Sequence, residues 1–117
     1  MKHGALYRAG SADCLVPEAR CTTNAWERMR GLLGRPPLAT GQGLLIDPCP
    51  SVHTIGMRYP LDLAFLDPQW RVLGMVHKLP PLRFAGRADA RATLELPPGA
   101  LAAAGIAAGD VLEWREA

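Results

Sequence analysis

Cysteine, aromatic side chains and long apolar runs are all scarce in this sequence. The 117 residues include 3 cysteines and 6% aromatic residues. Three cysteines cannot all pair within one chain, and no Cys-x-x-Cys motif occurs, so neither a disulfide framework nor a zinc-finger pattern is expected. No apolar segment approaches the roughly 20 residues that span a bilayer, and the N-terminal stretch does not resemble a signal peptide. We therefore expect free thiols, a cytoplasmic location and no membrane partner.

Blocks of like charge are absent as well. The chain has 13 Lys and Arg against 11 Asp and Glu, a formal net charge of +2. So small an excess, spread along the chain, gives no reason to expect a nucleic-acid partner. Apolar residues make up 49% and charged residues 21%, which are ordinary values for a globular protein. At this length we expect one domain, residues 1–117.

Glycine and proline, in contrast, are abundant, with 12 and 11 residues. They divide the chain into short segments, several of which have apolar residues at every second position, as in a β-strand. The clearest example is residues 61–67, which a turn at 67–70 joins to a second strand. Predicted strands lie at 5–8, 14–21 (with Pro17 at an edge or a bulge), 43–47, 51–55, 61–67, 70–79, 91–97 and 110–114.

Two segments favour helices. Residues 22–34 contain capping candidates at 22–24, an acid in the first turn, and apolar residues at helical spacing. We assign the apolar residues of this helix to the core: Trp26, Met29, Leu32 and Leu33. Residues 98–105 predict a short second helix, and 80–90 have the composition of a loop. Together these elements predict an all-β (mainly β) fold, a small single-domain barrel or sandwich with one or two short helices.

Several motifs, in one order, give the chain a resemblance to a known family. These are "ERMRGLLGR", "GLLI", "HTIGMRYPLDLAFLD", "RVL" and "LELPPGALAAAGIAAGDVL". The chain resembles domain of unknown function 192 (DUF192), a bacterial and archaeal family, most strongly over residues 20–114. The resemblance implies a small β-barrel-like domain with minor helices, and it implies no reaction, because the family has no established biochemical activity. Family positions carried over to this chain are Met57, Arg58, Pro60, Leu61, Asp62, Glu95 and Gly99.

A possible metal site lies in the segment 48–67. Cys49, His53 and Met57 supply a thiolate, an imidazole and a thioether, which are the ligand types of copper sites such as the loop of cupredoxins. Such a site needs a second histidine, His3 or His77. The alternative is a buried cysteine, a hydrogen-bonded histidine and a core methionine. We expect no cofactor, with Cu or Zn left open as the alternative.

The same segment gives less support to thiol catalysis. Residues four apart on a strand lie about 13 Å from each other, too far for proton transfer from Cys49 to His53. Many members of the family that the chain resembles also lack a cysteine at position 49, so chemistry that needs this thiol would not be shared across the family.

Charged residues inside apolar strands form the second candidate set. Asp62 lies between two leucines, as does Glu95. A carboxylate in such a place either points to solvent or is buried with a partner. For Asp62 the partner would be Arg58 or backbone N–H groups. The functional alternative is a polar pocket at the mouth of the barrel, with Arg58 holding an anion.

From these residues we predict a non-catalytic module that binds a small molecule or a protein partner. Its site would lie near the loop 53–62 and the loop 80–84, where Arg83 and Phe84 are predicted to be exposed. The predicted binding residues are His53, Met57, Arg58, Asp62, Arg83 and Glu95. The alternatives are an enzyme that uses Asp62 or Glu95 as general base, and a soft-metal protein that uses Cys49, His53 and Met57.

Overall fold

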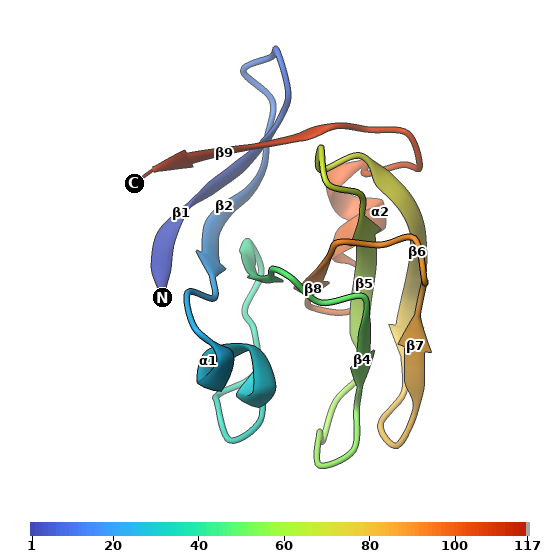
Figure 1. Cartoon of the computed structure of the whole chain (residues 1–117). Helices are drawn as coiled ribbons and strands as arrows, with labels where there is room; N and C mark the ends of the chain where they lie inside the picture. The colour runs from blue at the N-terminus through green and yellow to red at the C-terminus, as the bar shows by residue number, and fades with distance from the viewer. Residues whose placement is uncertain (117) are drawn as a thin grey trace.

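The computed structural model describes residues 1–116, which form strands connected by short turns, with two short helices (Figure 1). The mainly β prediction is confirmed, with 45% of residues in strands and 9% in helices. The elements are β1 (Lys2–Arg8), β2 (Cys14–Cys21), α1 (Ala25–Arg30), β3 (Gln42–Ile46), β4 (Ser51–His53), β5 (Leu61–Leu66), β6 (Val72–Leu79), β7 (Phe84–Gly86), β8 (Ala92–Leu96), α2 (Ala100–Ala104) and β9 (Leu112–Glu116).

Seven strands form one sheet in the order β6-β5-β8-β3-β2-β1-β9, and β4 pairs with β7 in a separate two-stranded sheet. Only β2 and β3 pair in parallel within the described residues, because the connection between them carries α1. The two edge strands of the large sheet approach each other at an isolated bridge between Arg71 and Val111. The sheet is not closed into a barrel, and the fold is sandwich-like.

The central strands β3, β5 and β8 are covered on both faces. One face of β5 and β8 packs into an apolar cluster that includes Leu94 and Leu96 of β8 and Leu101 of α2. The opposite face contributes Leu44, Leu63 and Phe65 to a second cluster, which the segment after α1 and the β4–β7 sheet cover. The alternating residues 61–67 predict a strand, and all six residues of β5 are buried. Both side-chain faces of β5 are buried because other segments of the chain cover each face of the sheet.

Helix α1 is shorter and more exposed than the sequence predicts. Asn24 caps it, its side chain accepting a hydrogen bond from the Glu27 N–H, and the helix ends at Arg30. The assignment of Trp26 and Met29 to the core is wrong: their exposed fractions are 67% and 71%. Six helical residues make fewer than two turns. The turn that follows makes the contact with the core instead, through buried Leu32.

Other local predictions are confirmed. The 67–70 turn joins β5 and β6, and the Asp67 side chain accepts hydrogen bonds from the N–H groups of Gln69 and Arg71. Pairing between β1 and β2 is irregular near Pro17, in agreement with a bulge. The segment 80–90 is largely a loop, but it also contains strand β7, which the sequence analysis missed. Neither described helix approaches the length of a membrane-spanning helix.

Candidate functional site

Glu95 lies in the middle of β8, on the face of the sheet toward the second apolar cluster. Its cross-strand neighbours are Leu44 on β3 and Leu63 on β5, and it is only 5% exposed. A carboxyl group between two leucines has lost most of its contact with water. Ionisation at this position is therefore costly unless hydrogen-bond donors surround the group.

Residues 1–116 supply no such donor. No hydrogen bond to the Glu95 carboxyl group is present among residues 1–116, and burial alone raises its pKa to about 7. An ordinary glutamate titrates near 4.5, so this group is partly protonated at neutral pH. A buried carboxyl group that lacks a partner within the fold is available to a ligand.

The turn that follows α1 covers Glu95. Gly31 adopts a φ of 53°, which favours glycine, and this conformation reverses the chain above the sheet. A β-carbon placed on Gly31 would lie 3.6 Å from Glu95 Oε1, so the turn passes directly over the carboxyl group. The next residue, Leu32, is buried in the second cluster and holds the turn in place.

A pocket of about 80 Å³ remains between this turn, β4 and β8, and we call it the Glu95 pocket. It brings together residues from four separate parts of the chain. Its lining residues are Arg28, Met29, Arg30, Gly31, Leu32, Leu33, Ile46, Cys49, Ser51, Val52, His53, Met57 and Glu95.

Cys49, His53 and Met57, the proposed metal ligands, all line the Glu95 pocket. The Cys49 thiol donates a hydrogen bond to the Ser51 carbonyl at 2.9 Å, and burial raises its pKa, with the charge of Glu95 adding to the effect. His53 is exposed, and its ring lies beside the Phe84 ring with centroids 6.1 Å apart. Within residues 1–116, no three His, Cys, Asp or Glu side chains are grouped closely enough to hold a metal ion.

Arg58 and Arg83 are exposed on the two loops predicted to form the site, but neither lines the pocket. Buried Thr54 ties these loops together. Its hydroxyl group donates to the Pro80 carbonyl at 2.7 Å and accepts from the Arg83 N–H at 2.8 Å. The loops 54–60 and 80–83 are therefore joined at the lower end of the molecule in Figure 1, below β4 and β7.

Asp62 is separated from the pocket by the sheet itself. It is fully buried on the opposite face, where its carboxylate accepts hydrogen bonds from the N–H of Lys78 at 2.8 Å and of Leu101 at 3.0 Å. Asp62 thus ties β6 and the start of α2 to β5. The expected pairing with backbone donors is what the structure contains, whereas Arg58 is not its partner. We leave Asp62 out of the site.

Polar residues at or near the pocket that the sequence analysis missed include Tyr59 and Arg28. The Tyr59 hydroxyl group is buried without a hydrogen-bond partner among the described residues, and burial raises its pKa, with Glu95 adding to the shift. Arg28 lines the pocket from α1 and lowers the pKa of Cys49 by its charge, although burial dominates that shift. Nothing in the local sequence distinguishes either residue, because only the fold brings them near Glu95.

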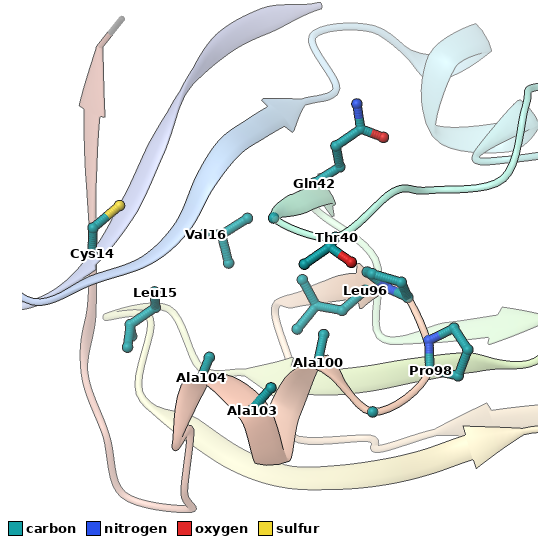
Figure 2. Close-up of a pocket in the computed structure, with 13 residues that line it drawn as sticks. Cys14, Leu15, Val16, Thr40, Gln42, Leu96, Pro98, Ala100, Ala103 and Ala104 are labelled. Atoms are coloured by element: carbon teal, nitrogen blue, oxygen red, sulfur yellow. The ribbon is translucent and has the colours of Figure 1, made fainter.

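A larger cleft of about 410 Å³ lies on the other side of the sheet, between β2, the end of β8 and α2 (Figure 2). Its walls are mainly small and apolar, including Leu15, Val16, Leu96, Ala100 and Ala103. Among residues 1–116, no buried polar side chain without a hydrogen-bond partner lines this cleft. The Glu95 pocket is therefore the stronger candidate, despite its smaller size.

Comparison with known proteins agrees with the fold and the motifs. The family model DUF192, described as an uncharacterized ACR family, matches residues 8–114. The chain belongs to the DUF192 family. The match includes both the Glu95 pocket and the apolar cleft, so this DUF192 domain carries them within its family region. No curated protein matches the chain.

Two crystal structures share the fold of this DUF192 domain. A protein of unknown function from Novosphingobium aromaticivorans DSM 12444 has a TM-score of 0.75 and 21% identity, over 96% of this chain and 84% of that one. A protein from Sinorhizobium meliloti 1021, provisionally described as a transcription regulator, has a TM-score of 0.79 and 21% identity, over 97% and 92%. At this level of identity the likeness shows the fold alone.

Proposed function

We propose that this protein is a non-catalytic binding domain whose site is the Glu95 pocket. The observation that carries the proposal is the buried Glu95 carboxyl group, which has no hydrogen-bond donor among the described residues and lines a pocket. A ligand that brings an N–H or O–H group to this carboxyl group would supply the missing hydrogen bond. Because charge-assisted hydrogen bonds in a desolvated site are strong, such a ligand gains both affinity and orientation.

An enzyme that uses Glu95 as general base is the second candidate. A carboxyl group with a pKa of about 7 is well suited to proton transfer near neutral pH. The pocket, however, measures about 80 Å³, which leaves little space for a substrate beside a base. The Cys49 thiol is directed to the Ser51 carbonyl, and burial raises its pKa, the opposite of an activated nucleophile. These features favour binding over catalysis.

A soft-metal protein remains the third hypothesis. Cys49, His53 and Met57 line one pocket, but the Cys49 thiol is hydrogen-bonded to a carbonyl and His53 lies at the exposed rim. Native mass spectrometry with and without Cu(I) or Zn(II) tests this hypothesis directly. Stoichiometric binding that Cys49→Ser abolishes would replace the proposed function.

The proposed function is tested with three-carbon probes that match the pocket in size. The 15N-labelled protein is titrated with n-propanol and n-propylammonium, which carry donors, and with propionitrile, which carries none. We expect millimolar binding of the donor probes, seen as amide shift changes at Gly31, Cys49 and Glu95, and weaker binding of propionitrile.

Two variants complete this test. Glu95→Gln should weaken binding of the donor probes at least threefold, while the exposed Arg71→Gln variant should bind like the wild type. Probes that shift only residues of the cleft between β2 and α2, or that leave the Glu95 pocket unchanged, would contradict the proposal.

A further inference from the structure

The large apolar side chains on the described surface gather at one end of the molecule. Trp26, Met29, Ile55, Leu82 and Phe84 are between 46% and 75% exposed. They belong to α1, to the loop after β4, and to the segment from the 80–83 loop into β7. These elements lie in the lower half of Figure 1.

Contacts place Met29 and Phe84 at the edge of the pocket, and a backbone hydrogen bond brings the segments of Ile55 and Leu82 together beside them. Met29 lines the pocket together with His53, and the Phe84 ring lies next to the His53 ring. The Leu82 N–H donates to the Thr54 carbonyl at 3.2 Å, which holds Leu82 near Ile55. We call Met29, Ile55, Leu82 and Phe84 the apolar rim. Trp26 lies one helical turn before Met29, on the same side of α1.

The same end of the molecule carries arginines without acidic partners. Arg28 and Arg30 line the pocket, and Arg58 and Arg83 project from the two loops. Among residues 1–116, none of these four lies within 4.0 Å of a carboxylate. Elsewhere on the chain, ion pairs hold Arg8, Arg87, Arg91 and Arg115 to acids.

The size of the pocket limits the occupant. Sites for small molecules usually measure about 300–1,000 Å³, and the Glu95 pocket measures about 80 Å³. It has room for one side chain or a few atoms. A small anchor site inside an exposed apolar rim is the arrangement of a protein interface, where one buried side chain is surrounded by apolar contacts and a charged periphery.

We propose that the occupant is a segment of another protein that combines acidic and apolar residues and inserts one donor-bearing side chain into the Glu95 pocket. This inference rests on the function proposed above and specifies its partner. The apolar residues would cover the apolar rim, and the acidic residues would pair with Arg28, Arg30, Arg58 and Arg83. A second copy of this chain does not fit, since it would place the same arginines opposite one another.

A nucleic acid fits less well than a protein segment. Three of the four rim residues are aliphatic or thioether side chains that offer no stacking surface, and the pocket ends in a carboxyl group that repels phosphate. The net charge of the chain is also only +2.

The test uses the full-length protein as bait for a phage-displayed library of random 12-residue peptides. Enriched sequences are synthesised and their Kd values measured by fluorescence anisotropy. We expect enrichment of peptides with Asp or Glu beside large apolar residues. Phe84→Ser should weaken binding of these peptides at least tenfold, and so should the double variant Arg28→Gln/Arg83→Gln.

The matched control is Arg20→Gln/Arg71→Gln, which removes two arginines that also lack acidic partners among residues 1–116 and do not line the pocket. Its Kd should stay within twofold of the wild type. Three results would overturn the inference: enriched peptides without acidic residues, a homodimer that Phe84→Ser dissociates, or tight binding of mixed-sequence DNA that the Arg28/Arg83 variant abolishes.

This test separates the partner from the proposed function. If the three-carbon donor probes bind the Glu95 pocket but no acidic and apolar peptide binds, the proposed function stands and the partner inference fails. If the probes do not bind and Glu95→Gln leaves peptide affinity unchanged, the pocket itself is not the site.

Discussion

Asp62 and Glu95 are buried carboxyl side chains on neighbouring strands of one sheet, and they face opposite layers of the fold. Asp62 lies opposite Leu96, and Glu95 lies opposite Leu63, one position along the same ladder. The Asp62 carboxylate accepts two backbone hydrogen bonds, whereas Glu95 has no donor among the described residues. Burial alone does not assign a role to an acid. The hydrogen bonds around it distinguish a side chain that holds the fold together from one that is available to a ligand.

The largest expected effect is the pH dependence that Glu95 introduces. Its pKa rises from 4.5 in the unfolded chain to about 7 in the folded protein, so folding favours the protonated form. The contribution of this protonated carboxyl group to the free energy of unfolding is fully present below pH 4.5 and is lost as the pH rises through 7. Between about pH 4.5 and 8.5 the free energy of unfolding should fall by about 3 kcal/mol more in the wild type than in Glu95→Gln.

Urea unfolding at several pH values measures this difference. Glu95→Gln serves as the reference because it retains all the other titrating groups. The same pH dependence in both proteins would mean that Glu95 finds a hydrogen-bond donor in solution, and the contrast with Asp62 would disappear.

A somewhat smaller effect is expected for Asp62→Asn. The amide keeps the volume of the side chain but offers one acceptor oxygen, so the N–H of either Lys78 or Leu101 faces an NH₂ group. The free energy of unfolding should fall by about 1–3 kcal/mol. Asp89→Asn, which alters an exposed acid paired with Arg87, is the matched control and should change stability far less. Equal losses in the two variants would remove the structural role assigned to Asp62.

The exposed residues around the Glu95 pocket should matter least for folding. His53→Ala and Arg58→Ala should each change the free energy of unfolding by less than about 0.5 kcal/mol, because both side chains are exposed. Thermal unfolding followed by circular dichroism checks this expectation. If either variant unfolds as readily as Asp62→Asn, the loop 53–62 is scaffold rather than part of a site.

The smallest effect, none at all, is expected for a reducing agent. Cys14, Cys21 and Cys49 are all free in the structure. The melting temperature should therefore be the same with and without dithiothreitol. A lower melting temperature under reduction would reveal a disulfide, and it would also argue against the expected cytoplasmic location.

The strands could be predicted from the sequence because glycine, proline and period-two patterns act locally. β2 matches its predicted bounds, and the hairpin of β5 and β6 follows from the 67–70 turn. The three-residue strand β7 could not be predicted, since a segment so short becomes a strand only through pairing with β4. The exposure of Trp26 and Met29 was equally inaccessible, because helical spacing shows which residues share a face but not whether anything covers that face.

The candidate site was predictable only in part. A glutamate between two leucines marks Glu95 from sequence, and the cluster of Cys49, His53 and Met57 marks the other wall. That these residues share one pocket depends on the pairing of β8 with β3 and on the turn at Gly31, which are long-range features of the fold. Asp62 has the same leucine-flanked pattern, so local sequence alone does not separate the two acids.

The near-neutral pKa of Glu95 also couples binding to the release of protons. At pH 7 a group with a pKa of about 7 is divided almost equally between its protonated and ionised forms. A partner that donates a hydrogen bond to the carboxylate selects the ionised form, so binding near neutrality would release protons to the solvent. Calorimetric heats of binding would then vary with the ionisation enthalpy of the buffer. In a cell, a modest acidification would loosen the complex without any change in the concentration of either protein.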